Sequence, residues 1–209
     1  MSHQPGLFDP PPDDREVTEP SATLDELHAK VRACTRCAEL VRSRTQPVPG
    51  VGPKRARVMF VGEAPGRWED EKGEPFVGDA GAYLTQLLEQ IGLQRSDVFI
   101  TNVIKCRPPE NRSPKPDEIE SCRPYLLRQI EYVRPDLVVL LGRFALEEFF
   151  PKEKITQAKG KPRPLTIGGR TIRALPLLHP AFGVRRQDLK PEIERDFWII
   201  RDLLKESND

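Results

Sequence analysis

The sequence lacks any apolar run that approaches the roughly 18 residues of a membrane-spanning helix. It also lacks the apolar core of a signal peptide, because its first residues are polar and acidic. The net charge is only +1, so the overall charge indicates no particular partner. Histidine and cysteine are scarce, with three and four residues. These absences predict a cytoplasmic protein with no membrane partner, whose cysteines serve as ligands rather than in disulfides.

Proline, by contrast, is abundant, with 22 residues concentrated near the N-terminus and in loops. Residues 1–20 combine prolines and acids with few apolar residues, which predicts a disordered acidic tail. The remaining chain, residues 21–209, is long enough for one sizeable core. A single domain is therefore the expectation for this part.

Four short apolar runs are typical of buried strands, at residues 58–61, 97–103, 137–141 and 171–178. Helical patterns separate and flank them, at 82–91, 142–150, 191–205 and in segments that start near residues 24 and 116. Pro124 is expected to kink or interrupt the helix that starts at 116. Residues 41–57 and the acidic segment after Gly66 are expected to be loops. The alternation predicts an α/β protein with a parallel sheet covered on both faces.

Two strand ends carry residues suited to chemistry. Gly62 to Gly66, G-E-A-P-G, end the first strand abruptly, and ligands of open α/β sheets bind outside the carboxyl ends of the strands. Phe76 follows beside several carboxylates, which would suit a flat heterocycle, although a core Phe in a tight connection is the alternative. His179 ends the last strand and precedes a short apolar segment and two arginines. This order favours a catalytic group beside a DNA-inserting wedge.

The four cysteines form one close pair, Cys34 and Cys37, and two singles, Cys106 and Cys122. A four-thiolate site could hold a structural zinc or an iron–sulfur cluster, and the spacing alone does not choose between them. Four buried apolar cysteines are the alternative.

Residues 154–187 contain no acid but eight lysines and arginines. This segregation predicts a positive face with nucleic acid as its partner, with a merely solvated face as the alternative. The other two histidines, His3 and His28, are interpreted as tail and surface residues.

Several motifs together resemble the iron–sulfur, or family 4, uracil-DNA glycosylases: G-E-A-P-G (62–66), G-E-P-F-V-G (73–78), T-N-V-I-K-C-R-P-P (101–109), H-P-A-F-G-V-R-R (179–186) and the four cysteines. The resemblance implies a three-layer α/β/α sandwich around a four-stranded parallel sheet. It implies a monofunctional DNA-repair enzyme that flips uracil out of DNA, hydrolyses its N-glycosidic bond and leaves an abasic site. It also implies a structural [4Fe–4S] cluster on the four cysteines, with zinc as the alternative occupant, and we expect a monomer associated with the nucleoid.

The same resemblance assigns roles at individual positions. Phe76 would stack on the flipped uracil, the Asn102 amide would read its edge, and His179 would stabilise the charge that grows on O2. Glu63 or Glu69 would handle the attacking water, although Glu63 could instead hold loop amides. Further base-site positions are Gly62, Ala64 and Asn111. The positions expected to contact DNA are Ser113, Phe182, Val184, Arg185 and Arg186.

Three further interpretations complete the sequence analysis. One relative traps uracil-DNA covalently through a His on an inserted basic loop, but residues 103–121 contain no His, so ordinary turnover is predicted. Residues Gln4 to Phe8, Q-P-G-L-F, resemble the peptide by which bacterial repair proteins bind the sliding clamp, with an inert tail as the alternative. Other functional classes are a zinc-containing nucleic-acid-binding module and a polymerase-associated accessory domain without catalysis.

Overall fold

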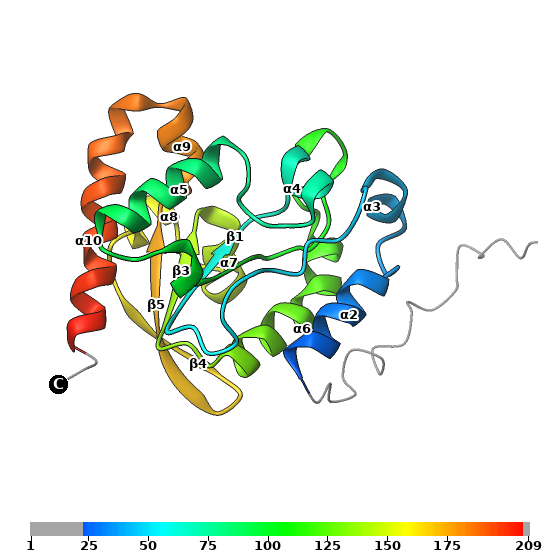
Figure 1. Ribbon diagram of the computed structural model, residues 1–209, viewed down its shortest axis with the longest axis horizontal. Helices are drawn as coiled ribbons and strands as arrows, with labels where there is room; N and C mark the ends of the chain where they lie inside the picture. Colours follow the sequence, from blue (N-terminus) through cyan, green and yellow to red (C-terminus); the bar gives the residue numbers. More distant parts are fainter. Residues whose placement is uncertain (1–22, 207–209) are drawn as a thin grey trace, which may run out of the picture.

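The computed structural model describes residues 23–206, so the predicted tail and its clamp-like peptide lie outside the described residues. Figure 1 shows helices packed around a central sheet. The helices are α2 (Leu24–Ala33), α3 (Ala38–Ser43), α4 (Arg67–Lys72), α5 (Asp79–Gln90), α6 (Pro116–Val133), α7 (Arg143–Phe149), α8 (Ile155–Ala158), α9 (Pro180–Arg185) and α10 (Lys190–Glu206). The strands are β1 (Val58–Gly62), β2 (Phe99–Asn102), β3 (Leu137–Leu141), β4 (Arg163–Ile167) and β5 (Arg170–Leu177), and the short 3₁₀ helices are η1 (Arg95–Asp97), η2 (Pro109–Asn111) and η3 (Gln187–Leu189).

The sheet has the strand order β2-β1-β3-β5-β4. Strands β2, β1, β3 and β5 are parallel, as predicted, whereas β4 pairs antiparallel with β5. The prediction of four strands is thus corrected to five. Strand β4 was missed because only Leu165 of its five residues is buried, so it forms no apolar run. A tight turn joins β4 to β5 through Gly168 and Gly169, both with positive φ.

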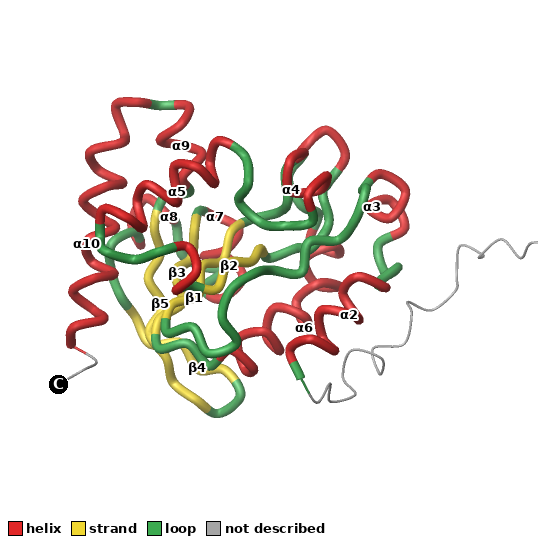
Figure 2. Tube along the Cα trace, viewed as in Figure 1, coloured by secondary structure: helices red, strands yellow, loops and turns green. Residues whose placement is uncertain are grey.

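The core lies on both faces of the sheet, because side chains of a strand point alternately to opposite faces. On β1, Met59 and Val61 pack with α2, α6 and α7, while Val58 and Phe60 pack with α5 and α10. Figure 2 shows the strands, in yellow, between these two groups of helices. The predicted α/β sandwich with helices on both faces is confirmed.

Three local expectations are corrected. The acidic segment after Gly66 is the helix α4 rather than a loop, with Glu69 accepting from the amide of its N-cap. Residues 38–43, at the edge of the basic segment expected to be a loop, form the short helix α3. Pro124 lies inside α6 and does not interrupt it. Within residues 23–206, no helix is long and apolar enough to cross a membrane.

Parallel pairing brings the carboxyl ends of several strands to one edge of the sheet. Gly62 is in register with Asn102, and Gly142 donates its amide to the carbonyl of Leu177, two residues before His179. The segments that follow β1, β2, β3 and β5 therefore surround one space.

Candidate functional site

A cleft of about 490 Å³ opens at this edge of the sheet. Its walls come from the segments after four strands, together with the loop around Phe76 and helix α9. Nearly all of the residues predicted for the base site line it: Glu63, Ala64, Glu69, Phe76, Asn102, Asn111 and His179. Gly62 lies beneath it, in contact with two of them.

Gly62 allows Asn102 and Phe76 to meet at the bottom of the cleft. A Cβ atom added to Gly62 would lie 2.7 Å from two carbons of the Phe76 ring and closer still to the amide oxygen of Asn102. No real Cβ tolerates such contacts, so a glycine is required at this position. Asn102 is buried, and within the described residues its amide makes no side-chain hydrogen bond to the protein. The amide is thus available to a ligand in the cleft.

Phe76 is held in an unusual backbone conformation, with φ of 54°, which a bulky residue adopts only where its surroundings impose it. Two side chains hold the flanking peptides. Glu69 accepts hydrogen bonds from the amides of Val77 (3.0 Å) and Gly78 (3.1 Å), and the Arg95 guanidinium donates to the carbonyl of Pro75. The rings of Phe76 and His179 stack with centroids 5.3 Å apart.

The two candidate carboxylates occupy different environments. The oxygens of Glu69 accept from three backbone amides, those of Gly66, Val77 and Gly78. It is therefore Glu69, rather than Glu63, that holds the loop amides. Glu63 is half-buried, and its burial raises the pKa of its carboxyl above the ordinary value, against the opposing effect of Arg143 and Arg185.

His179 caps the helix α9, because its Nδ1 accepts the amide proton of Ala181 at 3.1 Å. In the neutral ring this bond places the proton on Nε2, which can then donate into the cleft. Burial, and secondly the charge of Arg185, lower the pKa of His179 to about 4. The side chain is thus a neutral hydrogen-bond donor at neutral pH.

The residues predicted to contact DNA divide into two groups. Ser113, Phe182 and Arg185 line the rim of the cleft, and Phe182 is 46% exposed. Val184 instead packs against the core beside α10, and Arg186 forms two hydrogen bonds with Asp188. Of the residues predicted at the DNA wedge, Phe182 and Arg185 thus lie at the cleft.

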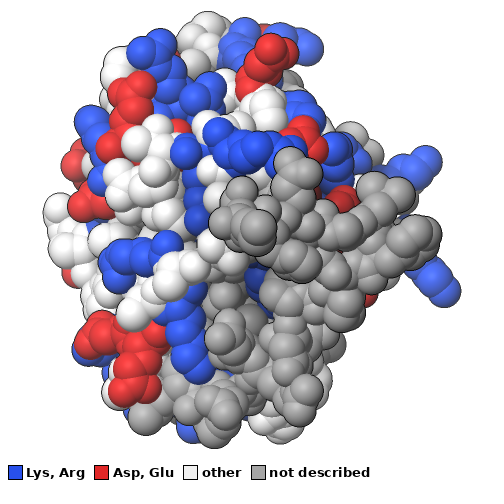
Figure 3. Space-filling view, turned by 90° about the vertical axis from the view of Figure 1, so that its right-hand side faces the viewer, with Lys and Arg blue, Asp and Glu red and all other residues white. Residues whose placement is uncertain are grey.

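The acid-free stretch does not form one continuous positive face. Its basic side chains pair with acids from elsewhere in the chain: Arg163 with Glu153, Lys159 with Glu192, Arg170 with Asp136, and Arg173 with Glu206. On another side of the molecule, the right-hand side in Figure 1, acidic and basic side chains are likewise interspersed (Figure 3). The sequence alone overstated the positive charge of this stretch, because folding pairs these four cations with acids outside the stretch.

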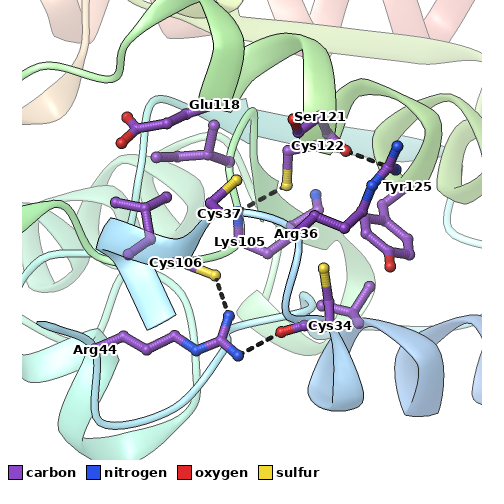
Figure 4. A pocket seen from close by; sticks show the side chains of 13 residues that line it. Cys34, Arg36, Cys37, Arg44, Lys105, Cys106, Glu118, Ser121, Cys122 and Tyr125 are labelled. Carbon is purple, nitrogen blue, oxygen red and sulfur yellow. Dashed lines mark hydrogen bonds between the residues drawn. The ribbon is translucent and has the colours of Figure 1, made fainter. Parts of the chain in front are cut away.

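The four cysteines, which lie on three separate segments, line one small pocket. Figure 4 shows their sulfur atoms around a common space. Arg44 donates to the sulfur of Cys106 at 2.7 Å, and the amide of Lys105 donates to the sulfur of Cys122 at 3.3 Å. Among residues 23–206, no three His, Cys, Asp or Glu side chains are grouped closely enough to hold a single metal ion. We call the four cysteines the cysteine cage.

His28 was interpreted from the sequence as a surface residue, but it is half-buried and belongs to a polar network. Its Nε2 lies 3.0 Å from the amide of Gln129, and burial lowers the pKa of its ring to about 4. Gln129 in turn contacts the buried ammonium of Lys105. Sequence reasoning missed Lys105, Arg44 and Arg95. The one available signal was the position of Lys105 directly after a buried apolar run.

The sequence of this chain is similar to known proteins over most of its length. The sequence model of the Uracil DNA glycosylase superfamily matches residues 49–200. The type-4 uracil-DNA glycosylase of Archaeoglobus fulgidus is 46% identical over 186 residues, which cover 87% of this chain and 93% of the relative. Those of Sulfurisphaera tokodaii and Saccharolobus solfataricus are each 44% identical over 187 residues, covering 87% of this chain and 84% and 86% of the relatives.

Proposed function

This chain belongs to the uracil DNA glycosylase superfamily, and from that premise and the geometry of its cleft we propose that it removes uracil from DNA in base excision repair. Water adds to C1′ of the deoxyribose, the N-glycosidic bond breaks, and uracil leaves as the free base, so an abasic site remains. The target base has to leave the stack to reach the cleft.

The observation that carries this proposal is the meeting of Asn102, Phe76 and His179 at the end of the sheet. The Asn102 amide, which has no hydrogen-bond partner among residues 23–206, offers one donor and one acceptor, which match O4 and N3–H of uracil. Cytosine presents the reversed pattern, so it would leave a buried amide unsatisfied and be rejected. The Phe76 ring supplies an apolar surface for the flat base.

His179 acts on the leaving group. Negative charge grows on O2 as uracil departs, and a neutral Nε2–H donor fixed by the α9 cap can stabilise it without reorganising. Because the pKa of about 4 leaves the ring neutral at pH 7, His179 has no acidic imidazolium proton to give. The N–H of a neutral imidazole is too weakly acidic to be transferred, so the contact is electrostatic.

Glu63 is the carboxylate that we assign to the water and to the positive charge on the sugar. It lines the cleft, and no backbone amide among the described residues occupies its oxygens. Glu69 lines the cleft as well, but its oxygens are taken by the loop amides. We therefore assign Glu69 to positioning Phe76 rather than to the chemistry.

The cysteine cage would hold a [4Fe–4S] cluster. A cluster needs thiolates arranged around a body of several atoms, and the four sulfurs surround one space without the tight grouping that a single ion requires. The Arg44 guanidinium and the Lys105 amide offset the negative charge on two sulfurs. Burial raises the pKa of the Cys37 thiol to about 11, so assembly of the cluster must displace protons. The cluster would supply structure. Zinc, the other occupant that the sequence allows, would require the sulfurs to move closer together.

The remaining partners are also proposals. Phe182 and Arg185 would enter the DNA beside the extruded base. The chain would act as a monomer at the nucleoid, and residues 4–8 would bind a sliding clamp. Deletion of residues 1–10 should abolish clamp binding and leave uracil release intact; unchanged clamp binding would exclude that role for the tail.

The experiment that tests the function is release of uracil from an oligonucleotide with a single uracil, presented as a single strand and as G·U and A·U duplexes. Alkali then cuts the strand at abasic sites. Asn102→Asp, which exchanges the amide for a carboxylate, should lose at least about 100-fold in rate. Gln157→Glu makes the same chemical exchange on exposed α8 and should have no effect. Equal activity of both variants, or no cleavage by folded wild-type protein, would contradict the proposal.

A further inference from the structure

Lys105 is fully buried between the cysteine cage and the cleft, and the mechanism above does not use it. Its ammonium donates to the Thr101 hydroxyl (2.7 Å), the Asn102 carbonyl (2.6 Å) and the side-chain carbonyl of Gln129 (2.7 Å). All three donor positions are therefore satisfied. A buried lysine is costly, so its presence at this position calls for a role.

The hydrogen bond from Lys105 to the Asn102 carbonyl compensates for the missing neighbour strand on one side of β2. Strand β2 is at the edge of the sheet, and only β1 pairs along its length. On the free edge, the backbone groups of Ile100 are taken by Val51. Asn102 is two residues further on and presents its carbonyl to the same edge. At this edge, the Lys105 ammonium donates the hydrogen bond that the amide of a neighbouring strand would otherwise donate.

The backbone of Lys105 is tied to the cage at the same time. Its amide donates to the sulfur of Cys122, and the next residue is Cys106. One residue thus connects two of the four thiolates to the end of the strand that carries the base-reading amide.

We propose that Lys105 is a positioning residue for uracil recognition: it fixes the end of β2, and hence the Asn102 amide, against the cysteine cage. This inference rests on the proposed function only for its activity readout. The Asn102 side chain has no hydrogen bond of its own to the described protein, so its position depends on the backbone that carries it. Loss of the ammonium should let the end of β2 fray and should impair the reaction without impairing DNA binding.

The test compares Lys105→Met, which keeps the length of the side chain and removes the donors, with Thr101→Val, which removes one acceptor from the same ammonium. Lys105→Met should lower kcat for uracil release by about 10- to 100-fold and leave KM for the oligonucleotide nearly unchanged. Free uracil should inhibit this variant more weakly by a similar factor. Thr101→Val should retain wild-type kcat, because the bond to the Asn102 carbonyl remains.

Hydrogen exchange reports the positioning itself. The amides of Val103 and Ile104, which bond to the carbonyls of Gly62 and Glu63, should exchange faster in Lys105→Met and not in Thr101→Val. Unchanged exchange at these two amides, or an equal loss of kcat in both variants, would overturn the proposal. If the wild-type protein released no uracil, the proposed function would fail, whereas the exchange result would still decide the role of Lys105.

Lys105→Arg keeps donors at the same place and is the rescue variant. It should recover most of the kcat that Lys105→Met loses. If Lys105→Met does not fold, the arginine variant decides alone: high activity together with fast exchange at Val103 would show that uracil release does not need a fixed end of β2, and would overturn the proposal.

Discussion

The substitution Gly62→Ala, which adds a single methyl group, should strongly slow uracil release while leaving the fold intact. A Cβ at this position would lie 2.7 Å from the Phe76 ring, whereas ordinary contacts begin at 3.4 Å. The ring must therefore move by about 0.7 Å, and the Asn102 amide at least as far. Phe76 cannot retreat easily, because its ring stacks on His179 and its backbone packs so closely on Gly81 that an added Cβ there would overlap the Phe76 carbonyl.

The magnitude follows from the displacement. Misplacing reacting groups by about 1 Å can lower a rate about 100-fold, which corresponds to roughly 2.7 kcal/mol of transition-state stabilisation. Overpacking a well-packed core costs about 1–3 kcal/mol of stability. Gly62→Ala should thus release uracil about 100-fold more slowly and melt at a moderately lower temperature.

The assay is single-turnover uracil release under conditions where all variants are folded. Gly92→Ala is the matched control, because Gly92 has φ of 79° and no atom within 4 Å of an added Cβ. The control should lose about 1 kcal/mol of stability through backbone strain and retain its rate. If Gly62→Ala cleaved within threefold of wild type, the assignment of Asn102 and Phe76 to base recognition would be refuted.

Four further predictions follow from single contacts. Glu69→Gln should lower both kcat and the melting temperature, by about 1–3 kcal/mol in stability, because at least one backbone amide loses its acceptor; unchanged melting would refute the role of Glu69 in holding the loop of Phe76. Because the pKa of His179 is about 4 rather than 6.5, stability from its neutral form should be lost only as pH falls from about 6.5 towards 4, and the rate should show no break near 6.5 from this group; a break at 6.5 that His179→Ala removes would contradict this. Arg185→Ala should weaken DNA binding and reduce its salt slope by about 1, whereas Arg170→Ala, whose cation pairs with Asp136, should leave the slope unchanged in a binding titration. Cys106→Ala should lose visible absorbance and iron content together with stability, and full cluster occupancy in this variant would exclude Cys106 as a ligand.

The parallel strands could be predicted because burial on both faces produces continuous apolar runs, as in Leu137 to Leu141. Strand β4 could not be predicted, because only one of its side chains is buried and its pairing with β5 forms only in the folded chain. Helix α4 could not be predicted because its residues are mostly charged. A short helix fixed by the carboxylates of Glu69 and Asp70 has the same composition as a loop.

Sequence motifs predicted which residues line the cleft, but they did not predict the separate role of each residue. Glu63 and Glu69 look equivalent in the sequence, and only the folded chain shows that three amides converge on one of them. Likewise, the basic stretch looked like a DNA-binding face because its acidic partners are distant in sequence: Glu192 on α10 is 33 residues from Lys159, and Asp136 before β3 is 34 residues from Arg170. Pairing of this kind leaves no local signal.

The cage and the cleft are linked along a second route, through which the proposed cluster would affect a reaction that transfers no electrons. Arg44 donates to the sulfur of Cys106 and to the carbonyl of Cys34, and the next amide, that of Thr45, donates to buried Asp70 on α4 at 2.9 Å. The neighbouring Glu69 holds the loop of Phe76. Lys105 links the cage to Asn102, so the stacking ring and the base-reading amide are each tied to the cage from a different side. Hydrolysis needs these two groups within a fraction of an ångström of their places, and short loops without regular structure would not hold them there. We therefore expect the proposed cluster to fix the positions of Phe76 and Asn102, and its loss should slow the chemical step before it unfolds the sheet.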